Sequence, residues 1–571
     1  MTTVTDDQQS HRAATEAPDR LAALSRLLHS PAVFWLGLAG LVALGLGLAY
    51  ALRFVQDDAF ISFRYAQNLV DGHGLVWEPG VAVQGYTNFL WTVLIAGGLA
   101  LGFEAVPAAQ ALGIAFYAVS VTAFVLLARR VLENGPVALG LGLVLVANYS
   151  FTSYATGGLE TSLLTALVTL SLLLAHRVLQ GPAGVATCAA LSLTLAMAGL
   201  TRLDSAVLVV VLTGTLALCL LARMQRREAM IRIGALVGPG LAVFLAYAVW
   251  TTLTYGSVVP NTFHVKAGGF SLEVIRRGIY YVFTFLHAYG LLLPVILALP
   301  FLWGRRGDAF FLALVAYLGL MLAYVARVGG DFMEFRLLIP LLPAILLVVG
   351  NGWVAMAAAL SRPLPLVLGT GALGFLVLVS AFHGFTYKDG TYTRPLLSIP
   401  ELSRQMTSPR ENWVGIGERL GALFPGGYET GPTVAIRAAG AVPYHSGLPV
   451  VDMLGLNDAW VARNGLVKGS TPGHQRNAPF RYLLDREVNL VIGHPMMRPA
   501  GAPLERRICT DEFYLFLDAE DDRQEAALAQ ARVLRVPIDA RYELAMLALA
   551  PHPSVEHLLQ SGAVAVLQHG L

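Results

Sequence analysis

Lysine, cysteine and charged residues are all scarce in this sequence. Only Lys266, Lys388 and Lys468 are lysines among 39 basic residues. The three cysteines have no zinc-type spacing, which excludes a disulfide framework and a structural zinc site. A net charge of +2 without a long basic run excludes a nucleic-acid-binding surface. Neither a glycine-rich phosphate loop nor a dinucleotide-binding fingerprint occurs, so nothing indicates a nucleotide cofactor.

Apolar residues, in contrast, make up 56% of the chain, and the mean hydropathy is +0.62. This composition predicts a polytopic α-helical membrane protein, surrounded by a lipid bilayer. A spanning helix needs roughly 17–25 mainly apolar residues. About eleven stretches are candidates: 33–52, 108–128, 137–152, 159–176, 186–201, 205–222, 234–254, 281–303, 309–326, 337–358 and 364–383.

Short basic loops predict the orientation, because such loops stay in the cytoplasm. With residues 1–32 as a disordered cytoplasmic tail, eleven spans put nearly all arginine-rich loops on the cytoplasmic side. The apolar piece 89–102 is short for a span and is predicted not to cross. We therefore expect a helical module at 33–383, followed at 384–571 by an extracytoplasmic α/β domain.

Local patterns within the last domain predict individual elements. Short apolar runs at 433–436 and 489–492 predict strands, and 521–533 predicts a helix. The chemistry-capable residues of the helical module fall in the loops on the same, extracytoplasmic side. Because ionisable groups at membrane depth are costly and tend to mark function, one outward-facing site is the economical explanation.

An aspartate pair, Asp57 and Asp58, opens the first of these loops and precedes the run AFISFRYAQNLV. The run predicts an amphipathic interfacial helix. One aspartate could simply cap that helix. A second carboxylate at the same place fits a general base that takes a proton from a sugar hydroxyl, or a metal ligand. The sequence leaves open whether a divalent cation binds here, and which aspartate is the base.

Two arginines in the outer loops, Arg202 and Arg336, fit a phosphate, because the planar guanidinium donates two parallel hydrogen bonds. Their neighbours Asp204, Asp331 and Glu334 could equally hold them in ion pairs at helix ends.

Three further residues complete the polar candidates. Lys266 is a compact cation suited to a phosphate oxygen, and it is kept in a chain that otherwise uses arginine. His264 is a candidate ligand or an ordinary hydrogen-bonded loop histidine. Glu160 either contacts substrate or binds nearby backbone amides.

The loop at 75–91 is rich in aromatic residues, among them Tyr86 and Trp91. Aromatic residues are expected at a membrane interface as an anchoring belt. The same rings can stack on sugar faces, so the loop is also a candidate acceptor-binding segment.

Several ordered motifs carry a family resemblance. The run QDDAFISFRYAQNLVDGHGLVWEPGVAVQGYTNFLW is followed by GGLET, GLTRLDS, PNTFHVKAG and GGDFMEFRLLIPLLP. Together they resemble the bacterial arabinofuranosyltransferase B family within the GT-C glycosyltransferase superfamily. The similar segments extend over about 50–500 of the chain.

The resemblance implies a bacterial plasma-membrane enzyme with no nucleotide donor. It implies transfer of arabinofuranose from decaprenyl-phosphoryl arabinose to a cell-wall arabinan or another glycan acceptor on the periplasmic side. Asp57 and Asp58 match the family's acidic pair, expected to be the catalytic base and its partner. Arg202, Lys266 and Arg336 match its phosphate-binding cations.

Two other classes of protein remain as alternatives. A secondary transporter would place its ionisable residues near the bilayer midplane and often contains repeats, whereas these residues gather at one face. A non-catalytic membrane scaffold would explain the helices and the last domain, but it would leave the aspartate pair without a function.

Overall fold

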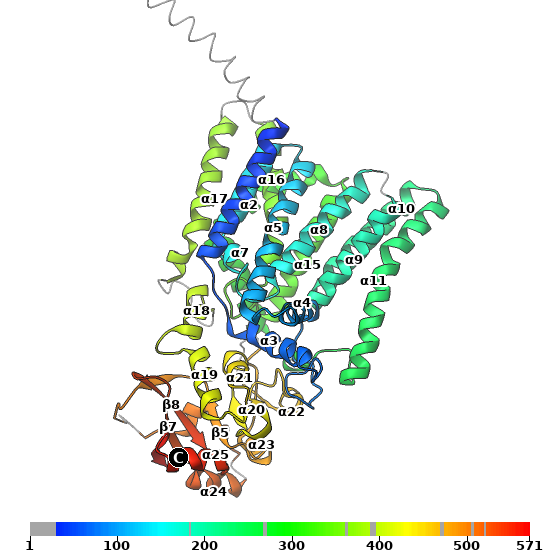
Figure 1. Cartoon of the computed structure of the whole chain (residues 1–571). Coiled ribbons are helices and arrows are strands. Elements are labelled where there is room, and N and C mark those ends of the chain that lie inside the picture. Colours follow the sequence, from blue (N-terminus) through cyan, green and yellow to red (C-terminus); the bar gives the residue numbers. More distant parts are fainter. Residues whose placement is uncertain are drawn as a thin grey trace, which may run out of the picture.

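The computed structural model describes residues 30–181, 184–266, 271–359, 364–388, 396–468, 473–503, 507–518 and 521–571. Two parts follow each other: a helical part at 31–388 and a sheet domain at 396–571. The sheet domain sits at one end of the helical bundle (Figure 1). Of the predicted tail, residues 1–29 lie outside the described residues.

Long helices build most of the helical part. Seven described helices are long and apolar enough to cross a membrane, or up to eight if one bent pair is a single span. The helices of this part are α2 (Pro31–Ala51), α3 (Asp57–Val70), α4 (Phe89–Ala100), α5 (Ala105–Leu132), α6 (Gly135–Ala147), α7 (Tyr149–Ser153), α8 (Thr161–Gln180), α9 (Val185–Thr201), η1 (Leu203–Ser205), α10 (Ala206–Arg223), α11 (Arg226–Tyr255), α12 (Asn261–Lys266), α13 (Leu272–Ala288), α14 (Leu292–Leu302), η2 (Trp303–Arg305), α15 (Ala309–Val328), η3 (Ile339–Leu341), α16 (Leu342–Ala359) and α17 (Leu364–Lys388).

Each of the eleven predicted stretches contains helix, but two are not single helices. The stretch 281–303 is split into α13 and α14, which are bent by 97° where Gly290 adopts a left-handed φ of 62°. The stretch 137–152 is split at Asn148, whose side chain accepts the Phe151 N–H at 2.9 Å and so starts the short helix α7.

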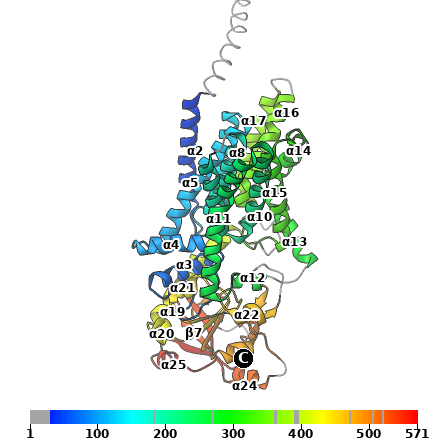
Figure 2. The same cartoon turned by 90° about the vertical axis from the view of Figure 1, so that its right-hand side faces the viewer.

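Two short helices lie near the junction between the two parts. Figure 2 shows α4 running across the direction of the long helices, as expected for the segment that was predicted not to cross. The amphipathic helix predicted after Asp57 is confirmed as α3.

Helix α3 joins the helical part to the sheet domain through buried polar contacts. The Arg64 Nη1 donates to the Pro443 carbonyl at 2.8 Å, and its Nη2 donates to the Leu448 carbonyl at 2.9 Å. From α12, the Asn261 side-chain amide donates to the Gly455 carbonyl at 2.8 Å. Because these donors are buried and satisfied, the junction is a fixed interface.

The sheet domain contains a seven-stranded mixed sheet in the order β2-β1-β5-β8-β7-β9, with β6 also paired to β8. Strand β1 is parallel to β2 and β5, while β8 is antiparallel to β5, β6 and β7. The strands are β1 (Val434–Ile436), β2 (Val450–Asp452), β3 (Leu466–Val467), β4 (Arg476–Asn477), β5 (Leu490–Gly493), β6 (Met497–Pro499), β7 (Arg532–Pro537), β8 (Tyr542–Ala548) and β9 (Ala565–His569).

Helices cover this sheet on both faces. They are α18 (Ile399–Thr407), α19 (Trp413–Leu423), α20 (Gly427–Thr430), α21 (Ala441–Ser446), α22 (Ala459–Asn464), α23 (Phe480–Asp485), η4 (Thr510–Phe513), α24 (Asp522–Gln530) and α25 (Pro553–Gln560). Val434 and Ile436 of β1 belong to the buried cluster that continues into the helical bundle, whereas Ala435 belongs to a second cluster on the other face. This alternation follows from the two-residue period of a strand.

The predicted strands at 433–436 and 489–492 are confirmed as β1 and β5. The predicted helix at 521–533 is shorter than expected. It is α24, which ends at Gln530, and Arg532 already begins β7. The β-branched and aliphatic residues of β7 pair with β8 and β9, so tertiary pairing ends the helix early.

Candidate active site

A cavity of about 830 Å³ lies between the helical part and the sheet domain. It brings together the outer-loop segments that the sequence placed on one side of the membrane. Among the residues that line it are Gln56, Asp57, Asp58, Thr87, Arg202, Asp204, Thr262, Phe263, Tyr324, Arg327, Asp331, Phe332, Arg336, Gln405, Trp413, Arg437, His474, His494 and Tyr514.

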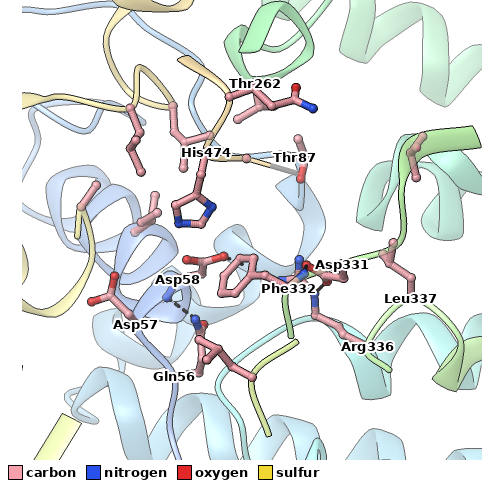
Figure 3. Close-up of a pocket in the computed structure, with 18 of the residues that line it drawn as sticks. Gln56, Asp57, Asp58, Thr87, Thr262, Asp331, Phe332, Arg336, Leu337 and His474 are labelled. Atoms are coloured by element: carbon pink, nitrogen blue, oxygen red, sulfur yellow. Dashed lines mark hydrogen bonds and ion pairs between the residues drawn. The ribbon is translucent and has the colours of Figure 1, made fainter. Parts of the chain in front are cut away.

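The two aspartates at the start of α3 have different surroundings. Gln56 caps the helix, because its side-chain oxygen accepts the Asp58 N–H at 2.7 Å. The capping role considered for an aspartate is therefore filled by Gln56. The Asp58 carboxylate lies 3.9 Å from Arg336 Nη1. Figure 3 shows Asp58 pointing toward His474 and Phe332, while Asp57 points away from them.

Asp57 is buried against the sheet domain. Its Oδ1 accepts the backbone N–H of Ala441 at 2.7 Å. Gly440 leaves the room for this contact, since a Cβ there would lie 2.0 Å from the Asp57 carbonyl oxygen. Burial raises the pKa of Asp57 to about 7, with Asp58 adding to the rise and the Ala441 N–H opposing it.

A tight loop after α15 presents Asp331 and Arg336. The loop begins at Gly330, which has a φ of 72°. Tyr281 packs so closely against this glycine that an added Cβ would lie only 2.6 Å from the Tyr281 ring. Phe335 also has a positive φ, 48°, and its ring lies among Tyr281, Phe285 and Tyr289 at 5.3 to 5.9 Å between centroids. A positive φ at a residue other than glycine persists only where packing holds it. The buried Phe335 ring therefore fixes the position of Arg336.

Within this loop, Arg336 Nε donates to Asp331 Oδ2 at 2.7 Å. Its terminal nitrogens form no hydrogen bond with the described residues and face the cavity near Asp58. Burial works against the charge, but Asp331 and other nearby carboxylates raise the pKa of Arg336. Glu334, considered as a partner of this arginine, instead accepts from Ser150 Oγ at 2.6 Å and from the Ile399 N–H at 2.9 Å.

Arg202 is held between two carboxylates. Its Nη2 donates to Asp204 at 2.8 Å and its Nη1 to Glu160 at 3.0 Å. Glu160 also accepts from the Asn88 side chain at 3.0 Å, and it lies behind Arg202 rather than in the cavity wall. The arrangement fixes the guanidinium plane.

Besides Glu160, three predicted site residues with described side chains do not line the cavity. Trp91 is fully buried and donates to the Gly158 carbonyl at 2.9 Å, and Tyr86 packs on Tyr65 with its hydroxyl 3.1 Å from the Tyr255 hydroxyl. His264 contacts the Phe263 ring at 5.9 Å but does not line the cavity. Lys266 ends α12, and its side chain lies outside the described part of the structure.

The sequence reasoning missed the contribution of the sheet domain. Gln405, Trp413, Arg437, His474, His494 and Tyr514 all line the cavity. The missed signal was the position of two residues just after predicted strands: Arg437 directly follows 433–436, and His494 follows 489–492 after one glycine. The carboxyl ends of neighbouring parallel strands are where open α/β sheets bind ligands.

No group of three or more His, Cys, Asp or Glu residues is arranged for a metal ion among the described residues. The carboxylates of this site are instead close to arginines or to backbone N–H groups. Asp331 and Asp204 each bind an arginine, and Asp57 binds Ala441.

This arrangement of long helices, a cavity and a C-terminal sheet domain has counterparts among solved membrane-protein structures. The crystal structure of ArnT from Cupriavidus metallidurans has the same fold, with a TM-score of 0.52 and 14% identity over 91% of this chain and 100% of that chain. The form bound to undecaprenyl phosphate matches equally, with a TM-score of 0.52, 13% identity and the same coverage.

Two curated relatives are similar to this chain in sequence. A terminal beta-(1->2)-arabinofuranosyltransferase of Mycobacterium tuberculosis is 28% identical over 358 residues, covering 55% of each chain. One of the same name from Corynebacterium glutamicum is 28% identical over 368 residues, covering 56% of this chain and 52% of that one. The chain thus spans about half the length of the curated relatives it matches, and the predicted resemblance is confirmed. Residues 405–545 also match a family described as a domain of unknown function (DUF8728).

Proposed function

We propose that this protein transfers a sugar from a polyprenyl-phosphate donor to a glycan acceptor. The observation that carries the proposal is the pairing of Asp58 and Arg336 across 3.9 Å in an 830 Å³ cavity at the end of a membrane-type helical bundle. A carboxylate and a cation at one such site provide the base and the phosphate ligand that the transfer needs.

Arg336 is the donor-phosphate ligand in this proposal. Its Nε is fixed by Asp331, while its terminal nitrogens are available for two phosphate oxygens. Arg327, at the end of α15, lines the same wall. Phe263 and Tyr324 line the same cavity, and Phe263 is exposed, so we assign to them the apolar path that the first isoprene units take toward the bilayer. Arg202 is a positioning residue, since its guanidinium is already held by two carboxylates.

Asp58 is the general base, and Asp57 is the residue that anchors α3. The Asp57 carboxylate is used by the Ala441 N–H and is buried, whereas Asp58 is 31% exposed toward the cavity. The carboxylate that can reach an acceptor hydroxyl is therefore the second of the pair.

The step is a direct displacement. Asp58 takes the proton of the acceptor hydroxyl as its oxygen forms a bond to the anomeric carbon of the donor sugar. The bond between that carbon and the phosphate oxygen breaks, and its electron pair leaves with the polyprenyl phosphate. Arg336 stabilises the charge that grows on the leaving oxygen. Asp58 then releases its proton to water.

The names of the relatives support arabinofuranose as the sugar, because both are arabinofuranosyltransferases. The carrier, decaprenyl phosphate, and the acceptor, cell-wall arabinan or a related glycan, are taken from the family resemblance of the motifs. The ArnT structure with undecaprenyl phosphate supports a lipid phosphate in this fold. We place the protein in the bacterial plasma membrane, with the cavity and the sheet domain, as its glycan-binding part, on the periplasmic side.

The test is sugar transfer by the purified protein in nanodiscs, from decaprenyl-phosphoryl arabinose to a short arabinan oligosaccharide. The wild type is compared with Asp58→Asn and Asp57→Asn at saturating donor. Asp58→Asn should lower the turnover number roughly 10²- to 10⁴-fold with donor binding retained. Asp57→Asn should keep turnover nearer the wild-type value in the fraction that stays folded.

Two outcomes would contradict the proposal. Equal turnover of Asp58→Asn and wild type would remove Asp58 as the base. A folded wild type that binds no polyprenyl phosphate and transfers no sugar would favour the transporter or scaffold alternatives.

A further inference from the structure

The sheet domain turns one edge of its sheet toward the cavity. Strands β2, β1 and β5 are neighbours and run parallel, so their carboxyl ends lie together. Arg437 follows β1, Leu454 and Leu456 follow β2, and His494 follows β5, and all four line the cavity. Open α/β sheets bind their ligands at this edge, so the sheet domain has a binding position of its own.

Local geometry fixes the side chain at the centre of this edge. The Arg437 N–H donates to the Gly493 carbonyl at 2.9 Å, where the pairing of β1 with β5 shifts register. Gly493 has a φ of 65°, and a Cβ there would lie 2.9 Å from the Phe513 carbonyl oxygen. The Arg437 guanidinium lies 3.9 Å above the Tyr514 ring, which holds its planar group.

The charge of Arg437 is unusual within this cavity. Arg202 and Arg336 each bind carboxylates, but Arg437 forms no ion pair with a carboxylate among the described residues. Its neighbour His494 adds no positive charge near neutral pH, since burial, followed by the charges of Arg437 and His474, lowers the pKa of His494 to about 4. A half-buried guanidinium without a counter-charge is costly unless a ligand supplies the negative group.

We propose that the carboxyl edge of the sheet domain binds an anionic group, a phosphate or a carboxylate, on the acceptor glycan, with Arg437 as its cation. The inference rests on the proposed function for the identity of the acceptor. The donor phosphate is assigned to the other side, because its lipid tail must stay with the helical part, where Arg336 lies. Acceptors that bear phosphate or carboxylate are thereby preferred over neutral ones.

The experiment measures equilibrium binding to the full-length protein in nanodiscs, without turnover. The probes are a neutral arabinan oligosaccharide, the same oligosaccharide with one phosphomonoester, inorganic phosphate, and polyprenyl phosphate. The variants are Arg437→Gln, Arg437→Lys and the matched control Arg463→Gln, which changes an exposed arginine of the same domain.

The phosphomonoester should tighten oligosaccharide binding roughly 10- to 100-fold in the wild type and in Arg463→Gln. Arg437→Gln should abolish this preference, and Arg437→Lys should keep part of it. Polyprenyl phosphate should bind all four proteins equally, and inorganic phosphate should bind weakly and compete with the modified oligosaccharide.

Equal binding of the two oligosaccharides to the wild type would overturn the inference. So would a loss of polyprenyl-phosphate binding in Arg437→Gln, since Arg437 would then serve the donor. Sugar transfer assayed on the same preparations separates the two proposals. Absence of transfer to both oligosaccharides would count against the proposed function, while the binding result would still decide the role of Arg437.

Discussion

The two walls of the cavity use charge in opposite ways. The helical part contributes arginines that are already bound to carboxylates, Arg202 to Glu160 and Asp204, and Arg336 to Asp331. The sheet domain contributes Arg437 on a tyrosine ring, together with the neutral ring of His494. Ion pairs with carboxylates fix the guanidinium groups of the helical wall, including Arg336, the proposed donor-phosphate ligand. Arg437, in contrast, has no carboxylate partner among the described residues.

The largest effect should come from removing Arg202, whose guanidinium binds two carboxylates in the helical part. Arg202→Met leaves the buried carboxylates of Glu160 and Asp204 without a guanidinium, which we expect to lower the free energy of unfolding by about 3–5 kcal/mol. Thermal and denaturant unfolding in detergent would measure the loss. Arg232→Met is the control, because its partner Glu228 is 54% exposed and such pairs contribute less than about 1 kcal/mol. Equal losses in both variants would mean that pairing does not stabilise this wall.

Next in size is the effect of Arg336 on the reaction. Arg336→Gln removes the charge that faces the leaving phosphate, so we expect turnover to fall roughly 10²- to 10³-fold. Arg336→Lys should recover part of it. Arg437→Gln, measured beside it at saturating acceptor, should leave turnover nearly unchanged. If Arg336→Gln and Arg437→Gln lost turnover equally, it would be wrong to assign the donor phosphate to the helical part and the anionic group of the acceptor to the sheet domain.

A smaller effect is expected at the junction of the two parts. Gly440→Ala places a Cβ 2.0 Å from the Asp57 carbonyl oxygen and should cost about 1–3 kcal/mol of unfolding free energy. It should also lower transfer, because the start of α3 must shift. Gly214→Ala in α10, where no heavy atom lies within 4 Å of the added Cβ, should be neutral or slightly stabilising. Measuring unfolding and sugar transfer on both variants tests whether the close contact between Gly440 and Asp57 stabilises the interface between the helical part and the sheet domain.

Measured over a single pH unit, the smallest effect is a pH dependence at the same junction. Burial raises the pKa of Asp57 from 3.8 to about 7, so between these values the folded protein keeps a proton that the unfolded chain has lost. Stability therefore falls as pH rises through this window, by at most about 1.4 kcal/mol per pH unit.

The measurement is the difference in unfolding free energy between wild type and Asp57→Asn at pH 5 and at pH 8. The variant should lose less stability than the wild type. His494, with its lowered pKa, is present in both proteins and cancels in the difference. Asp452, whose pKa burial raises to about 6, interacts with Asp57, so its change is part of the measured difference. An identical pH dependence in the two proteins would show that Asp57 does not titrate at the junction.

Periodicity and local pattern were enough to predict the elements themselves. Long apolar stretches marked the membrane helices, and apolar residues at helical spacing after Asp57 marked α3. The sequence also gathered Asp58, Arg202, Asp331 and Arg336 on one side, because each stands at a helix end on the same face of the predicted bundle. These inferences need only chain order and local composition.

Long-range contacts decided the rest. Nothing local distinguishes Asp57 from Asp58, although both line the cavity. The Ala441 N–H, 384 residues away in sequence, binds the Asp57 carboxylate, whereas the Asp58 carboxylate lies 3.9 Å from Arg336. Trp91 and Tyr86 were candidates for sugar stacking, but packing against α3 and the GGLET turn buries them. Arg437 joins the site through a parallel sheet whose strands are far apart in sequence. By itself the sequence determined the helices and the side of the membrane part on which the polar groups lie, whereas only the tertiary structure decided which of those groups share one cavity.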